Sequence, residues 1–158
     1  MRLVLICALC ACGGTLLLQA QNAVRTYVND KYSYQVDYSP SLLTAKGESD
    51  AGDGQIFASP DGKVEVRVWG QFNVLEETLA SKLAAAIRRD GLEKTEGLYK
   101  VLKPGWYVYS GVTRNGARIV YEKTLLSADA FKTIRFEYPV SEKARGDALV
   151  KSMVPTFR

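Results

Sequence analysis

Short stretches in which β-branched or aromatic residues alternate with polar ones recur along the chain, and each predicts a β-strand. In "KVEVRVWG", for example, Val64, Val66 and Val68 fall on one face while Arg67 and Trp69 fall on the other. The pattern predicts eight strands, over residues 33–38, 42–45, 55–59, 63–70, 98–102, 106–113, 117–126 and 131–138. A polar stretch, residues 46–54, is expected to be a loop.

Turn residues join several of these strands into hairpins. "SPDGK" places Pro60 and Gly62 where a tight turn needs them, and Asn115-Gly116 is the preferred two-residue hairpin connection. The second turn fixes a register in which Tyr109 lies opposite Glu122. The same register pairs these further residues: Tyr107 with Thr124, Val112 with Ile119, Ser110 with Tyr121, Val108 with Lys123, and Trp106 with Leu125.

Two segments have helical periodicity instead. Leucine or isoleucine recurs every four residues over 75–89, with Asn73 placed to cap the amino end and Gly91 to stop the helix. A second helix is expected over 141–153, before Pro155. Because hairpins dominate, we expect an α+β fold with a mostly antiparallel, twisted sheet flanked by helices.

The first 20 residues differ from the rest of the chain. One arginine is followed by an uncharged apolar run, which is typical of a signal peptide cleaved after Ala20 and leaves one domain over residues 21–158. All three cysteines, Cys7, Cys10 and Cys12, lie in this leader. The alternatives are a lipid anchor on Cys12, in a lipobox-like "LCACG", and an uncleaved membrane anchor. We therefore expect a secreted or periplasmic bacterial protein, held at the membrane only if Cys12 carries lipid.

Several dipeptides and their order resemble the PsbP-like superfamily. The matching segments are "YSYQVDYSP" at 32–40, "SPDGKVEVRVWG" at 59–70, the helix before "WYVYSG", Tyr138-Pro139 with a short helix, and the terminal Phe157. The resemblance spans about the whole domain and implies an α/β/α sandwich. That superfamily includes an extrinsic subunit of photosystem II, a small Ran-binding nuclear protein and secreted bacterial proteins without known activity. The glycine often found in the opening strand is absent here.

Composition narrows the chemistry. The 158 residues suffice for one domain with a core, and the net charge of +4 comes from scattered rather than clustered basic residues, so nucleic acid is not an expected partner. Histidine is absent, so the metal binding through histidine proposed for some photosynthetic PsbP relatives cannot carry over. We expect no cofactor, no metal and no catalytic residue. The acidic loop "DAGDG" lacks the ligand spacing of a calcium site, and Ser110 lacks the context of a nucleophile elbow.

Large aromatic and charged side chains on predicted sheet faces are the remaining candidates for a site. Arg67, Trp69, Tyr107, Tyr109 and Glu122 are the residue types that a binding surface uses. The competing interpretation is that these rings lie beneath a helix or a loop, since aromatics are common in strands.

These observations favour a non-enzymatic envelope protein that acts as a protein-binding or assembly module. The expected partner is an envelope or membrane protein, and the expected state is a monomer. The alternative is a carrier of a small molecule or lipid, with a pocket between sheet and helix near Trp106 and Tyr121. A hydrolase using Ser110 or paired carboxylates is a third hypothesis.

Overall fold

The computed structural model of the chain describes residues 23–113, 116–127 and 129–158. The strands are β1 (Arg25–Asn29), β2 (Tyr34–Tyr38), β3 (Thr44–Glu48), β4 (Gly54–Ala58), β5 (Glu65–Phe72), β6 (Tyr99–Lys103), β7 (Trp106–Val112), β8 (Arg118–Ser127) and β9 (Ala130–Pro139). The helices are α2 (Leu79–Arg89), α3 (Lys143–Met153) and two short 3-10 turns, η2 (Val140–Glu142) and η3 (Val154–Thr156).

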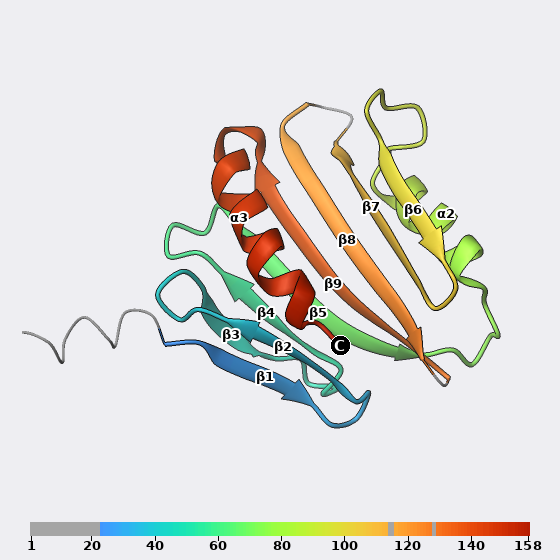
Figure 1. Cartoon of the computed structure of the whole chain (residues 1–158), viewed down its shortest axis with the longest axis horizontal. Coiled ribbons are helices and arrows are strands. Elements are labelled where there is room, and N and C mark those ends of the chain that lie inside the picture. Colours follow the sequence, from blue (N-terminus) through green and yellow to red (C-terminus); the bar gives the residue numbers. More distant parts are fainter. Residues whose placement is uncertain (1–22, 114–115, 128) are drawn as a thin grey trace, which may run out of the picture.

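Seven of the strands form one antiparallel sheet. Their order is β3-β4-β5-β9-β8-β7-β6, and β1 and β2 form a separate hairpin (Figure 1). The expected α+β class with an antiparallel sheet is confirmed. The register predicted for β7 and β8 is also confirmed in full, from Trp106 opposite Leu125 to Val112 opposite Ile119.

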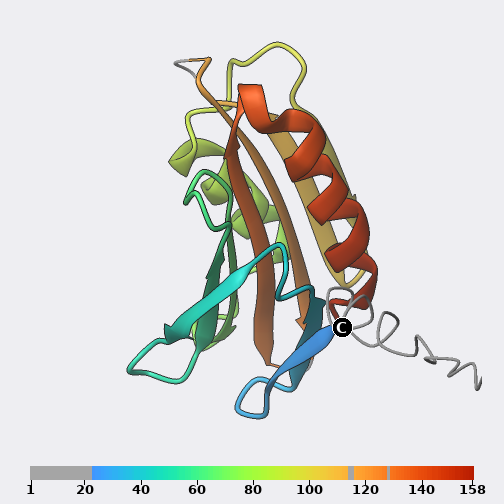
Figure 2. The ribbon, with the colours of Figure 1, turned by 90° about the vertical axis from the view of Figure 1, so that its left-hand side faces the viewer.

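The two helices lie on opposite faces of the sheet (Figure 2). Helix α3 packs on β9 and β2, and encloses a core that contains Val66, Val68, Phe136 and Leu149. Helix α2 packs on β7 through Leu83, Ala86 and Ile87, which cover Tyr107, Tyr109 and Val120. Since each helix covers only part of its face, the sheet has two uncovered regions.

Helix α2 begins later than its apolar periodicity predicts. The predicted start at residue 75 is wrong, because the helix starts at Leu79 with Thr78 as its cap, whose side chain accepts a hydrogen bond from the Ser81 amide. The Asn73 side chain instead accepts from the Glu77 amide at 2.8 Å and donates to the Glu77 carbonyl at 2.9 Å. Residues 73–77 therefore form a closed turn, and Leu75 is 78% exposed.

Other boundaries also differ from the sequence prediction. Strand β1 was not predicted, and the strand expected over 42–45 lies at Thr44–Glu48, so it extends into the stretch 46–54 that was expected to be a loop. The predicted final helix divides into η2 and α3. The signal peptide, the cleavage after Ala20 and the lipidation of Cys12 concern residues outside the described ones. Among the described residues, no helix is long and apolar enough to span a membrane.

Candidate functional site

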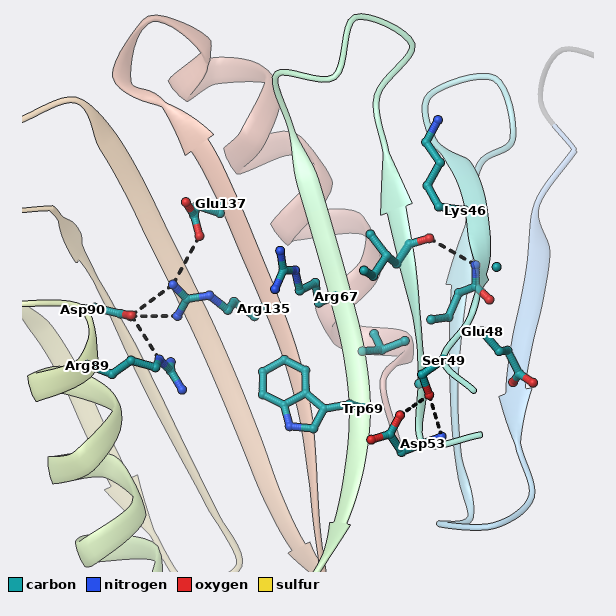
Figure 3. A pocket seen from close by; sticks show the side chains of 15 residues that line it. Lys46, Glu48, Ser49, Asp53, Arg67, Trp69, Arg89, Asp90, Arg135 and Glu137 are labelled. Atoms are coloured by element: carbon teal, nitrogen blue, oxygen red, sulfur yellow. Dashed lines mark hydrogen bonds and ion pairs between the residues drawn. The ribbon is translucent and has the colours of Figure 1, made fainter. Parts of the chain in front are cut away.

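A groove of ≈ 710 Å³ lies on the part of the α2 face that α2 does not cover. Its floor is formed by β4, β5 and β9, one wall by β3, and the other wall by the carboxyl end of α2 (Figure 3). Trp69 lies on the floor, with Arg89 and Asp90 on one side and Ser49 and Asp53 on the other. The groove is therefore an open trough with one large aromatic ring near its middle.

The strand register aligns the side chains of this face into rows that cross the sheet. Two neighbouring rows cross β5, β9, β8 and β7: Trp69–Thr133–Thr124–Tyr107 and Arg67–Arg135–Glu122–Tyr109. Each row starts in the open groove and ends beneath α2. The exposed and buried parts of the face are thus joined by direct cross-strand neighbours.

The neighbouring strand β4 leaves one side of the Trp69 ring uncovered. Gly54 on β4 lies opposite Trp69, and a Cβ atom at Gly54 would come within 2.0 Å of the Val68 carbonyl oxygen. Only glycine fits this close approach, so β4 presents no side chain next to the indole. The ring consequently remains half-buried and accessible from the groove.

A buried carboxylate anchors the wall under α2. Glu122 is 1% exposed, and its Oε1 accepts a hydrogen bond from the Tyr107 hydroxyl at 2.9 Å. Its Oε2 accepts from Arg89 at 2.6 Å and from Arg135 at 3.3 Å. The buried negative charge is therefore matched by two guanidinium groups, as burial of a charge requires.

Asp90, the residue that ends α2, forms the second half of this network. It accepts two hydrogen bonds from Arg135, at 2.7 and 3.1 Å, and one from the Tyr109 hydroxyl at 2.6 Å. Burial alone would raise the pKa of the Asp90 carboxyl, but the hydrogen bonds from Arg135, Tyr109 and Arg89 outweigh it and lower that pKa. Asp90 thus fixes the end of α2 to the middle of the sheet.

The same network keeps its other members in one protonation state. Burial, followed by the charge of Glu122, raises the pKa of the Tyr107 and Tyr109 hydroxyls. For Arg89 and Arg135, the neighbouring carboxylates outweigh burial and raise the pKa. At neutral pH all these groups keep their ordinary charge, so the network is suited to holding two arginines at the groove edge rather than to transferring a proton.

A smaller cavity of ≈ 300 Å³ continues the groove beneath α2. Tyr107, Phe131 and Thr133 lie on its sheet side and Ala86 on its helix side, and Lys82 also lines it. Trp69 and Arg89 line both this inner cavity and the groove. These two side chains therefore form the partition between the two spaces.

The structure divides the five binding residues that the sequence singled out into two groups. Arg67 is exposed and Trp69 half-buried, and both line the groove. Tyr107, Tyr109 and Glu122 are at most 3% exposed because α2 covers them. These three residues are not on an exposed surface but lie beneath a helix, as the competing interpretation had it, and they support the groove wall. Their binding role stays a prediction.

Sequence reasoning missed Arg135, Asp90 and the β3 wall. Arg135 carried a usable signal, because "FKTIRFEY" alternates and places Thr133, Arg135 and Glu137 on one face of a strand. No sequence signal identifies Asp90, since its contact with Arg135 depends on where α2 ends over the sheet.

The carrier hypothesis expects a pocket between sheet and helix near Trp106 and Tyr121. Strand alternation turns both residues away from α2, and neither lines the groove or the inner cavity. Within the described part of the chain, no cluster of three histidine, cysteine or acidic side chains is arranged to hold a metal ion.

Comparison with solved structures yields several matches to chains of the same fold. No family model matches the chain, and neither does any curated protein sequence. The solution structure of cyanobacterial PsbP (CyanoP) from Synechocystis sp. PCC 6803 superimposes with a TM-score of 0.57 at 13% sequence identity, over 92% of this chain and 97% of that one. The chain has a PsbP-like fold. At this identity the likeness concerns the fold alone, and a fold does not by itself determine a function.

Proposed function

We propose that this PsbP-like chain is a non-enzymatic protein-binding module of the bacterial envelope, and that its groove holds a short segment of a partner protein. The observation that carries the proposal is the half-buried Trp69 on the groove floor, next to arginines fixed by buried carboxylates. Tryptophan and arginine dominate the binding energy of protein interfaces when they sit in such partly enclosed positions.

Pre-organisation supports this role. Arg135 is held by Asp90 and Glu122, so its side chain loses little freedom when a partner binds. Among the residues that the structure describes, Arg67 is paired through its Nε with Glu65 alone and remains exposed, which leaves its two terminal nitrogens able to donate to a partner. A rigid wall beside one adaptable arginine favours a defined segment over non-specific contact.

The charge of the groove fits a polypeptide better than a polyanion. Lys46, Arg67, Arg89 and Arg135 line it together with Glu48, Asp53, Asp90 and Glu137, so the two signs balance. Balanced charges around an apolar centre match a segment that carries both acidic and basic side chains. The envelope location rests on the leader over residues 1–20, with a lipid anchor on Cys12 as the alternative form.

A carrier of a small molecule is the second candidate, and the inner cavity supports it. At ≈ 300 Å³ this cavity has the volume of a small ligand site, and aromatic side chains form much of its wall. Its mouth is narrowed by Trp69 and Arg89, so a ligand in it would contact the groove as well.

Photocrosslinking in the envelope of the native host tests the proposal. We expect benzoylphenylalanine at position 67 to give a discrete protein adduct that the Trp69→Ala substitution abolishes. The same crosslinker at Lys151, an exposed position on α3, is the matched control and should give no such adduct. Identical adducts from both positions, or an adduct that persists in the Trp69→Ala variant, would contradict the proposal. Native mass spectrometry of the same preparation reports a co-purified small molecule, which would favour the carrier.

A further inference from the structure

The other face of the sheet is also covered over only half its width. Figure 1 shows α3 in front of β9, whereas β6, β7 and β8 have no helix in front of them. Helix α3 and the β1–β2 hairpin enclose the core over β4, β5 and β9. The side of β6, β7 and β8 that faces away from α2 is therefore only partly covered: Ile119 of β8 belongs to the core under α3, and Tyr121 and Leu125 pack against that core.

Aromatic and aliphatic side chains dominate this uncovered region, which we call the open face. Side chains alternate between the two faces of a strand, so the residues next to those buried under α2 point to the open face. They are Tyr99, Val101 and Lys103 of β6, Trp106, Val108, Ser110 and Val112 of β7, and Ile119, Tyr121, Lys123 and Leu125 of β8. Tyr99 is 57% exposed and Val112 37%, Trp106, Tyr121 and Leu125 are half-buried, and Val108 and Ile119 are buried. Such a contiguous apolar area on a small protein is typical of an interaction surface.

The charges on the open face all have one sign. Lys103 and Lys123 are its charged members, and β6, β7 and β8 contribute no carboxylate to it. The carboxylate of Glu122 lies on the opposite side, under α2. Within the described residues the side chain of Lys123 makes no hydrogen bond or ion pair, in contrast to the paired arginines of the groove.

Lys123 lies where the open face meets the core under α3. It lies on β8 between Tyr121 and Leu125 along the strand, and opposite Val108 of β7 and Ile134 of β9. Burial by these neighbours lowers the pKa of its ammonium group, and no acidic neighbour compensates. An ammonium in this position gains from an added counter-ion more than an exposed one does, because its surroundings are already partly dehydrated.

We propose that the open face binds a segment of a partner protein that presents one carboxylate to Lys123 and apolar side chains to Trp106 and Tyr121. A single half-buried cation fits a single carboxylate. The phosphate backbone of a nucleic acid would instead need a line of several cations, and the open face holds only two. A bilayer would need apolar side chains on a protruding loop or helix, whereas these side chains form a shallow sheet surface. The open face is distinct from the groove, since the two lie on opposite sides of the sheet.

Binding of defined probes tests the inference. The probe is a short amphipathic peptide with leucine on one face and a single glutamate at its centre, compared with analogues that carry glutamine or lysine there. We expect fluorescence anisotropy to show the glutamate peptide binding about tenfold more tightly than the glutamine analogue at low ionic strength. In the Trp69→Phe variant, Trp106 is the remaining tryptophan, so its emission reports whether the peptide reaches the open face.

Matched variants separate the charge of Lys123 from its packing. Lys123→Met should remove the preference for glutamate, and Lys123→Arg should restore most of it. Lys100→Met, which removes a lysine from the α2 side of the neighbouring strand β6, should leave it unchanged. Trp69→Ala should also leave the preference for the glutamate peptide unchanged, because Trp69 lies in the groove on the other side of the sheet. The test of the open face is therefore independent of the test of the groove.

Three results would overturn the inference. The first is equal affinity for the glutamate and glutamine peptides, or none for either. The second is a glutamate preference that survives in the Lys123→Met variant. The third is tighter binding of an oligothymidylate, or of phosphatidylcholine vesicles containing phosphatidylglycerol, than of the glutamate peptide, which would assign the open face to a nucleic acid or to lipid.

Discussion

Two buried carboxylates and two arginines determine the shape of the groove wall. Glu122 and Asp90 each bind both Arg89 and Arg135, so the charges cancel within one cluster. A cluster of this kind adds little net stability compared with apolar packing, but loss of one member leaves an uncompensated buried charge and costs about 3–5 kcal/mol. The contribution of these residues is therefore mainly to position the arginines that line the groove.

The lowered pKa of Asp90 predicts how stability depends on pH. Because that pKa is lower in the folded than in the unfolded chain, the unfolded chain takes up the proton first as the pH falls below about 4. The stabilisation from Asp90 is complete above this pH and is lost towards the folded-state pKa. We expect urea unfolding between pH 5 and pH 2 to show a shallower acid loss of free energy in Asp90→Asn than in the unsubstituted chain. Asp37→Asn is the control, and an unchanged slope in Asp90→Asn would contradict this assignment.

At the residue scale, alternation alone predicted which side chains share a face. It placed Arg67 with Trp69, and Tyr107 with Tyr109 and Glu122, and the register confirms these assignments. It could not show that β9 lies between β5 and β8, because strand order depends on contacts between distant segments. Without that order, neither the role of Arg135 nor the separation of the five residues into groove and buried wall could be predicted.

The amino end of α2 shows how local hydrogen bonds override helical periodicity. Leu75 continues the spacing of Leu79, Leu83 and Ile87, yet the turn closed by Asn73 holds it in solvent. Glu76 within this turn has a φ of 53°, a left-handed conformation that costs a non-glycine residue about 1 kcal/mol or more. Asparagine favours such turns because its side chain satisfies nearby backbone groups.

The late start of α2 gives a direct prediction for its leucines. Leu75→Ala should change the free energy of unfolding by less than about 0.5 kcal/mol, because the side chain is 78% exposed. Leu83→Ala, in the same predicted stripe but 7% exposed, should cost about 2–4 kcal/mol. Chemical denaturation of the two variants measures both values. Similar large losses in the two would mean that Leu75 packs against the sheet as helical periodicity indicates.

Strands β1 and β3 were missed or displaced for a related reason. All five residues of β3 are exposed, and its pairing with β4 is irregular between Ala45 and Glu48, so no apolar alternation marks it. Its polar residues nevertheless form one wall of the groove. Exposed edge strands are held by their backbone pairing, which hydrophobic pattern does not report.

On the scale of the whole molecule, one close contact sets the position of α3 on the sheet. A Cβ atom at Gly146 would lie within 2.4 Å of the Tyr138 ring, so the helix approaches β9 directly over a glycine. The Tyr138 hydroxyl then donates to Asp147 at 2.7 Å, which fixes the contact laterally. The core that α3 closes includes Leu149, Met153 and Phe157.

Substitution at this contact should destabilise the whole domain. We expect Gly146→Val to lower the free energy of unfolding by about 2–3 kcal/mol, since the added methyl groups must displace the helix or the ring. Ala148→Val, at an exposed position of the same helix, is the matched control and should cost less than about 1 kcal/mol. Thermal unfolding distinguishes the two, and equal shifts of the midpoint would show that α3 has room to move.

The half-covered faces have a consequence for stoichiometry. The groove over β3, β4, β5 and β9 and the open face over β6–β8 lie on opposite sides of one seven-stranded sheet, which is about 29 Å wide at the usual strand spacing. Two partners bound there would not touch, so occupation of one surface would leave affinity at the other unaltered. For a protein that bridges two partners in this way, the amount of ternary complex is greatest at an intermediate concentration of the bridging protein. When it is scarce few pairs are joined, and when it is in excess each partner is saturated by a separate copy, so the ternary complex should rise and then fall as the protein is titrated.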